Sequence, residues 1–283
     1  MHRPGSLGTA ILQGLLTTSN PTNKLAVIRA TVGSKASVDA LGETLRGMAS
    51  RISSPVEKNV YHDENTLVAQ DSDVIILACP PDKMSTILME DGMPNALHEK
   101  LLISVLAGVT SKSIHGAISI RSPTGPSGCY VVRAMPNLAV AQHASATAIE
   151  IPVPDFPVEK FNLVDSIFQQ LGGVVHLPPS LMDAATVMCG STPAFIALFL
   201  DGLIDGAVAA GVPRSKADIM ASQVLASTAA LMQDGQRAST LRETVCGMPG
   251  CTIQASIVLD QGGVRGTAAT AMKAAITAAQ KLG

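Results

Sequence analysis

A short run of small residues ahead of a helix is the clearest chemical feature of the C-terminal half. Residues 248–253 read Met-Pro-Gly-Cys-Thr-Ile and precede a segment whose apolar residues have helical spacing. At that helix start the amides of Gly250, Cys251 and Thr252 would lack intrahelical partners, and the helix dipole would favour an anion. The run therefore predicts a site for a small anion such as a carboxylate. An ordinary N-cap by Thr252 is the alternative.

A second group of small residues, near the N-terminus, indicates phosphate binding. Gly5, Ser6, Leu7 and Gly8 read as the second half of a G-x-G-x-x-G turn that leads into a helix. In such a turn the glycines let the backbone approach a pyrophosphate at the positive end of the helix. A helix start without a ligand is the alternative, because Arg3 stands in place of the first glycine and the usual preceding strand is lacking. An N-terminally incomplete sequence would explain both departures.

A polar cluster about twenty residues further on bears on the type of dinucleotide. Arg29, Thr31, Ser34 and Lys35 stand at the end of an apolar run, where an NAD-binding protein would usually carry Asp or Glu. Basic and hydroxyl groups at this place would accept a 2′-phosphate, so the cluster predicts NADP. The alternative is that Arg29 and Lys35 are solvated surface residues.

Composition excludes several other classes of function. Twenty basic and 22 acidic residues give a net charge of -2, which provides no field for nucleic acid or an anionic membrane. With no Trp, 2 Tyr and 5 Phe, we expect no stacking platform for bases. The five cysteines form no C-x-x-C pair and the six histidines lack metal-ligand spacing, so we expect no metal site and a reducing, cytoplasmic compartment. Asp201 and Asp205 interrupt the most apolar stretch, so we expect no membrane span.

The elements that must position these residues follow from the hydrophobic pattern. Up to about residue 151, short apolar runs alternate with segments of helical length, which is typical of βαβ units and a mostly parallel sheet. The expected strands are residues 25–31, 56–61, 73–79, 101–106, 130–135 and 146–151. We therefore predict an α/β fold with a doubly wound, Rossmann-type sheet that lacks its usual first strand. In a complete unit that strand would lie in the middle of the sheet.

Beyond about Val158 the pattern is helical to the C-terminus, apart from a short stretch at residues 172–177. Three prolines within residues 152–157 predict the boundary between a dinucleotide-binding domain, residues 1–155, and an all-helical domain, residues 156–283. The expected helices cover residues 194–210, about twenty residues after Pro213, and about 265–281. The first is apolar nearly all round, so most of it must be buried, and a second subunit would supply part of the cover.

Several runs, taken in order, resemble the pyrroline-5-carboxylate reductase family. The longest is residues 182–195, which read Met-Asp-Ala-Ala-Thr-Val-Met-Cys-Gly-Ser-Thr-Pro-Ala-Phe. Further runs follow at residues 211–214, 241–242, 250–253 and 262–266, and upstream runs at 73–78, 104–109 and 133–137 are similar to the family's cofactor-domain segments. The resemblance covers essentially the whole chain from Gly5, and several motifs in register are far more specific than any single one.

This resemblance implies NAD(P)H-dependent reduction of 1-pyrroline-5-carboxylate to L-proline, with NADPH the expected cofactor and NADH the second choice. It also implies a homodimer, with larger rings of dimers as an extension. The expected cofactor-binding residues are Gly5, Ser6, Leu7 and Gly8 at the pyrophosphate, Arg29, Ser34 and Lys35 at the 2′-phosphate, Asn65, Ala78 and Cys79 at the adenosine, and Ala107, Gly108, Met135, Pro136 and Asn137 beside the nicotinamide. The expected substrate-binding residues are Ser191, Gly250, Cys251 and Thr252, with the Thr252 hydroxyl facing the ring nitrogen as the catalytic partner.

The expected chemistry asks for orientation more than for a strong acid. A protonated cyclic imine already carries the charge that makes its carbon accept a hydride, so Thr252 would orient the ring nitrogen. The chain departs from the family pattern at Pro80, where Lys is common, and at Thr192 and Pro249, which occupy usual glycine positions. These departures leave two alternatives open: a catalytically weakened paralogue, and a related imine reductase that acts on another cyclic imino acid.

Overall fold

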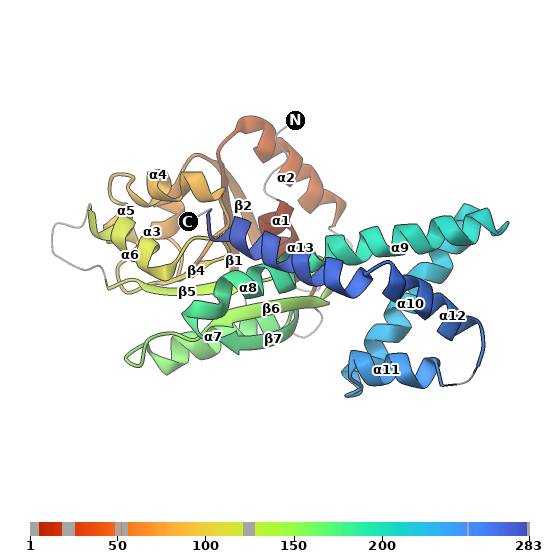
Figure 1. Ribbon diagram of the computed structural model, residues 1–283. Coiled ribbons are helices and arrows are strands. Elements are labelled where there is room, and N and C mark those ends of the chain that lie inside the picture. The colour runs from red at the N-terminus through yellow and green to blue at the C-terminus, as the bar shows by residue number, and fades with distance from the viewer. Residues whose placement is uncertain are drawn as a thin grey trace. The chain divides into compact units, whose positions relative to one another are not determined.

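The protein is described by a computed structural model of its 283 residues, which describes residues 6–18, 26–48, 52, 56–120, 128–247 and 249–281 (Figure 1). The chain divides into two compact units. The sheet unit comprises Met1–Ser191 together with Ala275–Gly283, and the helical unit comprises Thr192–Ala274.

The strands of the sheet unit form two separate sheets. β1 (Val27–Val32) and β2 (Glu57–His62) are a parallel pair. The second sheet has five strands in the order β3 (Val74–Leu77), β4 (Leu101–Ser104), β5 (Tyr130–Met135), β6 (Ser145–Glu150) and β7 (Gly172–Leu177). All neighbours in it are parallel except β5 and β6, which are antiparallel. The predicted mostly parallel, Rossmann-type arrangement is therefore confirmed, and the expected strands are found within two residues of their predicted ends.

Helices and 3-10 turns connect these strands. The α-helices are α1 (Ser6–Thr17), α2 (Lys35–Gly47), α3 (Asn65–Gln70), α4 (Met84–Leu88), α5 (Met93–Ala96), α6 (Ser111–Ile120), α7 (Val158–Gln169) and α8 (Met182–Ala185). The 3-10 turns are η2 (Pro81–Lys83), η3 (Leu138–Gln142) and η4 (Pro179–Leu181), and η5 (Thr186–Ser191) is a π-helical turn.

The break between the two sheets lies where the doubly wound order would place the strand that precedes α1. In the described residues no ladder joins β1 to β3, and α1 contacts both sides of the break. Leu12 and Leu16 pack in a cluster with β1 and β2, whereas Ala10 and Ile11 pack in a cluster with β4 and β5. α1 thus supplies apolar contacts to the strands on both sides of the break.

The core of the five-stranded sheet is covered on both faces, as alternating side chains of β4 show. Leu102 faces a cluster that includes Ile114 and Ile118 of α6. Its neighbours Leu101 and Ile103 face the opposite cluster, which includes residues of α1 and α7. Strands buried on both faces are the reason that β4 reads as a continuous apolar run.

The sheet unit extends further along the chain than the sequence predicted. The prolines of residues 152–157 do mark a connection, but the unit continues to Ser191. α7 covers the sheet with the fully buried Phe168, and β7 pairs with β6 over six residues. Because both elements complete the core of the sheet, residues 158–191 belong to it rather than to the helical part.

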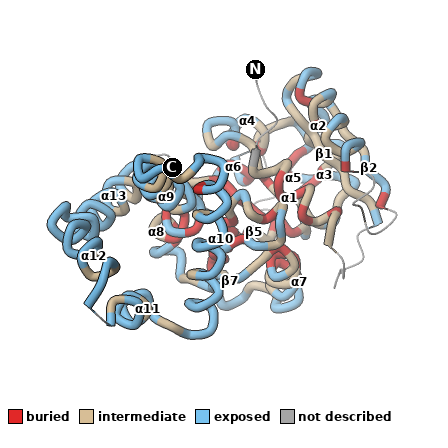
Figure 2. The backbone as a smooth tube through the Cα atoms, turned by 90° about the vertical axis from the view of Figure 1, so that its right-hand side faces the viewer, coloured by how far each residue is buried: buried red, intermediate tan, exposed pale blue. Residues whose placement is uncertain are grey.

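The helical unit consists of α9 (Thr192–Ala209), α10 (Arg214–Gln233), α11 (Ala238–Val245), α12 (Cys251–Gln261) and most of α13 (Val264–Ala279). Pro213 precedes α10 and fixes the extended backbone before it, as the sequence predicted. Figure 2 shows buried residues concentrated in the sheet unit, while α9 to α13 are almost entirely exposed. Among the described residues of this unit only Ala217 is buried, so its apolar side chains are open to a partner.

Candidate active site

The predicted cofactor residues gather where parallel strands end. Ala78 and Cys79 follow β3, Ala107 and Gly108 follow β4, and Met135 ends β5. Since β3, β4 and β5 run parallel, these segments share one edge of the sheet, which is where open α/β sheets bind ligands. Gly108 has a φ of +75°, a left-handed conformation that a glycine adopts without strain.

The start of α1 lies against the same edge. A Cβ atom on Gly8 would stand 3.1 Å from the Cβ of Ala78, so the glycine allows close packing of helix on strand. This is the role of the last glycine in a dinucleotide-binding turn. Because α1 begins at Ser6, its first amides have no partner within the helix, and a helix start of this kind favours an anion. Gly5 lies outside the described residues.

Asn137, which follows β5, is held by three hydrogen bonds. Its backbone amide donates to Ser145 Oγ at 3.1 Å, and its Oδ1 accepts from the amide of Ala139 at 3.0 Å. Its Nδ2 donates to the carbonyl oxygen of Cys189, in η5, at 3.1 Å. The predicted nicotinamide-flanking segment is therefore rigidly joined to the π-helical turn that ends at Ser191.

Apolar packing brings the same segments together. Met135, Met182 and Cys189 form a buried cluster with Ala185 and Ala148, and Ala107 packs against it. The structure thus unites Ala107 and Met135, predicted beside the nicotinamide, with α8 and η5. Ser191, predicted to bind the substrate, is the last residue of η5 and is half-buried.

On the adenosine side the predicted residues come from two places in the fold, the start of α3 and the end of β3. Asn65 begins α3, and its Nδ2 donates to Glu90 Oε1 at 2.6 Å. Cys79 is half-buried, and burial raises the pKa of its thiol to about 11, so it stays neutral near pH 7. Pro80, at the site of a common lysine in the family, leads into η2.

Ser34 and Lys35 lie directly after β1, as a 2′-phosphate site requires. Ser34 caps α2: its Oγ accepts from the amide of Ser37 at 3.2 Å, and Lys35 is exposed. The start of α2 favours an anion at this place. The nearby Thr31 Oγ1 is buried and has no hydrogen-bond partner among the described residues.

Arg29 corrects the sequence-based prediction. Its Nη1 donates to the carbonyl oxygen of Asp71 at 3.0 Å, and its Nε lies 4.0 Å from Asp71 Oδ2. Asp71 follows α3 and precedes β3, so this contact is at the edge where strands begin, opposite the cofactor edge. Arg29 lies early in β1, so its side chain is closer to the edge where the strands begin. This contact therefore does not support the prediction that Arg29 holds a 2′-phosphate.

The loop predicted to bind an anion belongs to the helical unit. Gly250 is extended, with φ 177° and ψ −165°, and α12 begins at Cys251 without a side-chain cap among the described residues. Cys251 is exposed and Thr252 is half-buried. The helix start that the sequence predicted is therefore present, and its use as a carboxylate site stays a prediction. Met248 lies outside the described residues.

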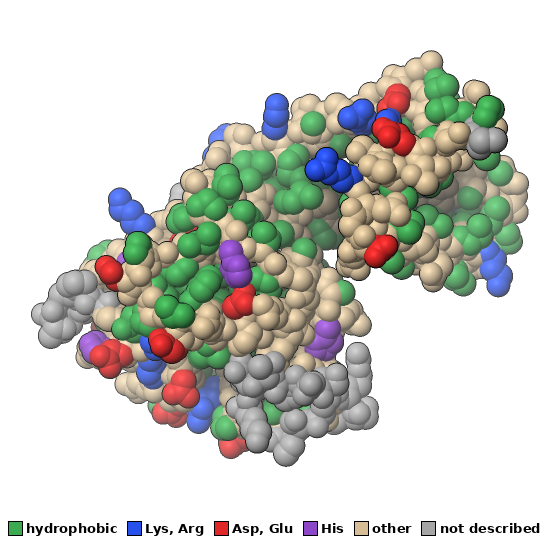
Figure 3. Space-filling view, turned by 90° about the horizontal axis from the view of Figure 1, so that it is seen from below, with side chains coloured by type: hydrophobic (Ala, Val, Ile, Leu, Met, Phe, Trp, Pro, Cys, Tyr) green, Lys and Arg blue, Asp and Glu red, His purple; other side chains and the backbone are tan. Residues whose placement is uncertain are grey.

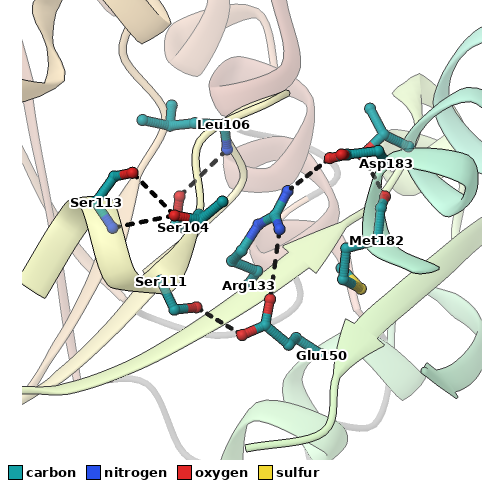
Figure 4. A network of polar contacts seen from close by, with 10 residues as sticks. Ser104, Leu106, Ser111, Ser113, Arg133, Glu150, Met182 and Asp183 are labelled. Carbon is teal, nitrogen blue, oxygen red and sulfur yellow. Dashed lines mark hydrogen bonds and ion pairs between the residues drawn. The ribbon is translucent and has the colours of Figure 1, made fainter. Parts of the chain in front are cut away.

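Sequence reasoning missed two features. One is a cavity of about 270 Å³ that is lined by residues of α11 and α12 and by Cys246. Arg242 and Asp260, which both line this cavity, form an ion pair of 3.8 Å. The other is a buried polar cluster around Arg133 in the sheet unit, shown in Figure 4. Charged residues inside the apolar strands 130–135 and 145–150 were the signal that could have revealed it.

Comparisons with known proteins agree with this arrangement. Residues 179–282 match the family model for pyrroline-5-carboxylate reductase dimerisation, and residues 4–108 match that for NADP oxidoreductase, coenzyme F420-dependent. A pyrroline-5-carboxylate reductase of Lophium arboricola is 37% identical to this chain; the alignment covers 99% of this chain and 91% of the relative. A pyrroline-5-carboxylate reductase of Neurospora crassa is 36% identical, and the alignment covers the same shares of the two chains. A solved pyrroline-5-carboxylate reductase of Coxiella burnetii has a TM-score of 0.78 at 25% identity and covers 98% of this chain and 95% of its own. The NADP-bound pyrroline carboxylate reductase of Plasmodium falciparum also has a TM-score of 0.78, at 20% identity. The match covers 99% of this chain and 95% of the Plasmodium chain.

Proposed function

This chain belongs to the pyrroline-5-carboxylate reductase family, and from that premise we propose how its own residues perform the reaction. The reaction is the NAD(P)H-dependent reduction of 1-pyrroline-5-carboxylate to L-proline, the last step of proline synthesis. The assignment is carried by the identity of 37% and 36% to two such reductases over 99% of this chain. Neither the sheet edge nor the comparisons favour a weakened paralogue or a reductase of another cyclic imino acid.

The cofactor is NADP, and the residues at the sheet edge fit it. Gly8 allows α1 to approach β3, and the free amides at the start of α1 would hold the pyrophosphate. Ser34 and Lys35 would hold the 2′-phosphate, with the unpartnered Thr31 hydroxyl beside them. When bound, NADPH supplies the hydride. The segments at Ala107 and Met135 would then flank the nicotinamide.

Substrate binding is assigned to Ser191 and to the amides of Gly250, Cys251 and Thr252. A carboxylate accepts hydrogen bonds from free amides at a helix start, where the dipole also favours it. The imine carbon gains the hydride, and the protonated ring nitrogen keeps its proton and becomes the amine of proline. We assign the Thr252 hydroxyl the role of orienting that nitrogen, because a fixed orientation of the imine favours hydride transfer.

The protein is a homodimer, and the helical unit supplies the surface. Leu198 is 76% exposed, Val258 66% and Ile219 65%, and hydrophobic side chains cover much of the face shown in Figure 3. Exposed apolar surface of this kind is typical of a site that binds another protein. A second copy of the chain would bury these side chains, and we propose that dimers assemble further into rings.

One helical run, Pro179–Ala209, is long and apolar enough to cross a membrane, with a mean hydropathy of 1.7. Of its most apolar stretch, 11% is buried. The dimerisation family model covers this run completely. We propose that a second subunit, not lipid, covers it and that the enzyme works in the cytoplasm. Dimer formation in buffer without detergent tests this proposal: we expect a mass of about twice 29.1 kDa.

The decisive experiment is turnover by the purified full chain. With NADPH and 1-pyrroline-5-carboxylate we expect loss of the 340 nm absorbance of NADPH and an equal amount of L-proline. A panel of five- and six-membered cyclic imino acids identifies the preferred ring. Absence of turnover with both NADPH and NADH, in protein that binds NADPH in calorimetry, would contradict the assignment.

The role of Thr252 is tested by Thr252→Val, which keeps the size of the side chain and removes the hydroxyl. Loss of one orienting hydrogen bond predicts a fall in kcat of about tenfold or more. The control is Thr244→Val, because the Thr244 hydroxyl bonds only to the carbonyl oxygen of Thr240 in its own helix. Equal kcat values for the two variants would remove Thr252 from the mechanism.

A further inference from the structure

A guanidinium group lies inside the sheet unit, next to the proposed nicotinamide site. Arg133 of β5 has a side-chain exposure of only 2%. Its Nη1 is 3.5 Å from Glu150 Oε2, and its Nη2 forms an ion pair of 3.6 Å with Asp183 Oδ1. Neither Nε nor Nη2 has a hydrogen-bond partner in the described residues. Removing a charge from water costs several kcal/mol, and an apolar residue of similar size would often be at least as stable. The charge therefore calls for an explanation other than stability.

The two carboxylates come from elements that are far apart in the sequence. Glu150 ends β6 and also accepts a hydrogen bond from Ser111 Oγ, at the start of α6, at 2.7 Å. Asp183 belongs to α8 and retains 30% exposure. Figure 4 shows the Arg133 side chain between these two carboxylates. One cation thus connects β5 with β6, α8 and, through Glu150, the start of α6.

The residues that Asp183 anchors form a junction segment, which we define as residues 182–191. This segment comprises α8 and the π-helical turn η5. π-helical turns are rare and frequently lie at functional sites. The junction segment is attached to β5 and its extension at two points: Asp183 meets Arg133 near its beginning, and the Cys189 carbonyl oxygen accepts from Asn137 Nδ2 near its end.

We infer that Arg133 is a positioning residue for the reductase reaction. Its attraction for Asp183 holds the junction segment on β5, so that Ser191 and Asn137 keep a fixed placement relative to each other. This inference rests on the proposed function, because Ser191 is assigned to the substrate and Asn137 to the nicotinamide side. We assign Arg133 no direct contact with either molecule: it acts through the segment that it holds, and we expect binding of the adenosine half to be independent of it.

The test uses Asp183→Asn, which removes the charge but keeps the shape of the side chain. Because Asp183 is partly exposed and the Arg133–Glu150 pair stays intact, we expect this variant to fold. We expect kcat/KM for 1-pyrroline-5-carboxylate to fall at least about tenfold, while the Kd for NADPH changes less than about twofold. Asp183→Glu should recover part of the loss. The matched control is Asp165→Asn, which alters the 2.7 Å contact between Asp165 Oδ1 and His176 Nε2, two residues that lie outside the junction segment.

A second variant tests whether Arg133 and Asp183 act as a pair. If they do, the double variant Arg133→Met with Asp183→Asn should lose no more kcat/KM than Arg133→Met alone. Fully additive losses would overturn the inference. So would a parallel loss of NADPH affinity and of substrate kcat/KM in Asp183→Asn, since that is the result of general destabilisation.

A readout without substrate separates this inference from the proposed function. Hydrogen exchange of the backbone amides should accelerate in residues 182–191 of Asp183→Asn and stay unchanged in β4. Unchanged exchange in residues 182–191 would overturn the role of Arg133, even if the wild-type chain is an active reductase. Accelerated exchange in a chain with no turnover would show that the Asp183 contact holds the junction segment, and would contradict both the proposed function and a role of Arg133 in that reaction.

Discussion

The two sides of the dinucleotide site are built differently. On the nicotinamide side, β4 is fully buried, and Asn137 and Arg133 tie the end of β5 to the junction segment. On the adenosine side, β1 is only half-buried along its length, and in the described residues it pairs only with β2. The segments proposed to flank the reacting ring thus rest on core packing, whereas those proposed for the adenosine half rest on α1 and on a two-stranded sheet. The more deeply packed segments are therefore the ones proposed to serve hydride transfer, which needs precise geometry.

The largest test of this difference applies the same substitution to both sides. Ile103→Ala removes a fully buried side chain from β4 and should lower the free energy of unfolding by about 2–5 kcal/mol. Ile28→Ala, in the half-buried β1, should cost about half as much or less. Chemical denaturation of the two variants measures both values. Equal losses would show that the adenosine side is as well packed as the nicotinamide side.

Two helical glycines test the role of α1 as the connection between the sides. A Cβ on Gly14 would come within 2.3 Å of the Val140 carbonyl oxygen, so Gly14→Ala should cost about 1–3 kcal/mol and weaken NADPH binding. In α2, Gly42 has only an ordinary contact of 3.5 Å with Arg46, and Gly42→Ala should stabilise the protein by about 0.5–1 kcal/mol. Thermal unfolding and NADPH titration give both readouts. A neutral Gly14→Ala would mean that α1 can move without loss.

The preference for NADPH over NADH tests which residues of the adenosine side contact the 2′-phosphate. Lys35→Ala should raise the KM for NADPH roughly threefold to tenfold and leave the KM for NADH unchanged, because only NADPH carries the 2′-phosphate. Arg29→Ala should leave the ratio of the two KM values unchanged, since Arg29 contacts Asp71. The opposite pattern, with Arg29 controlling the ratio, would restore the prediction made from the sequence.

The smallest expected effect concerns Cys79. Burial raises the pKa of its thiol from 9.0 to about 11, so the unfolded chain loses this proton first as the pH rises. The contribution of Cys79 to stability is therefore complete below about pH 9 and declines between pH 9 and about 11. Cys79→Ala should flatten the fall of the unfolding free energy over this interval. An identical slope in the variant would show that Cys79 does not titrate there.

Most of the elements could be predicted from local sequence, and so could much of the candidate site. The strand over residues 130–135 was predicted with its observed bounds because β-branched and apolar residues mark it locally. The amides at Gly250 and the turn at Gly8 were identified because helix starts have local signatures. The placement of Gly250 to Thr252 beside the substrate stays a prediction.

What local patterns could not supply were the partners of charged side chains. Arg29 stands near the end of a predicted strand, yet its side chain reaches Asp71, 42 residues away. Arg133 reaches Asp183, which lies on another element. A charge in an apolar strand indicates that a partner exists, but its identity depends on which distant segments meet.

The amino-acid sequence by itself determined the order of elements, the starts of the helices and the family of this protein, because periodicity, capping and motif spacing are properties of neighbouring residues. Only the tertiary structure decided that the strands divide into two sheets bridged by α1, that residues 158–191 complete the sheet unit, and that Arg133 joins β5 to the junction segment. These features arise from contacts between distant segments. Such contacts depend on the packing of the whole core, which no local pattern encodes.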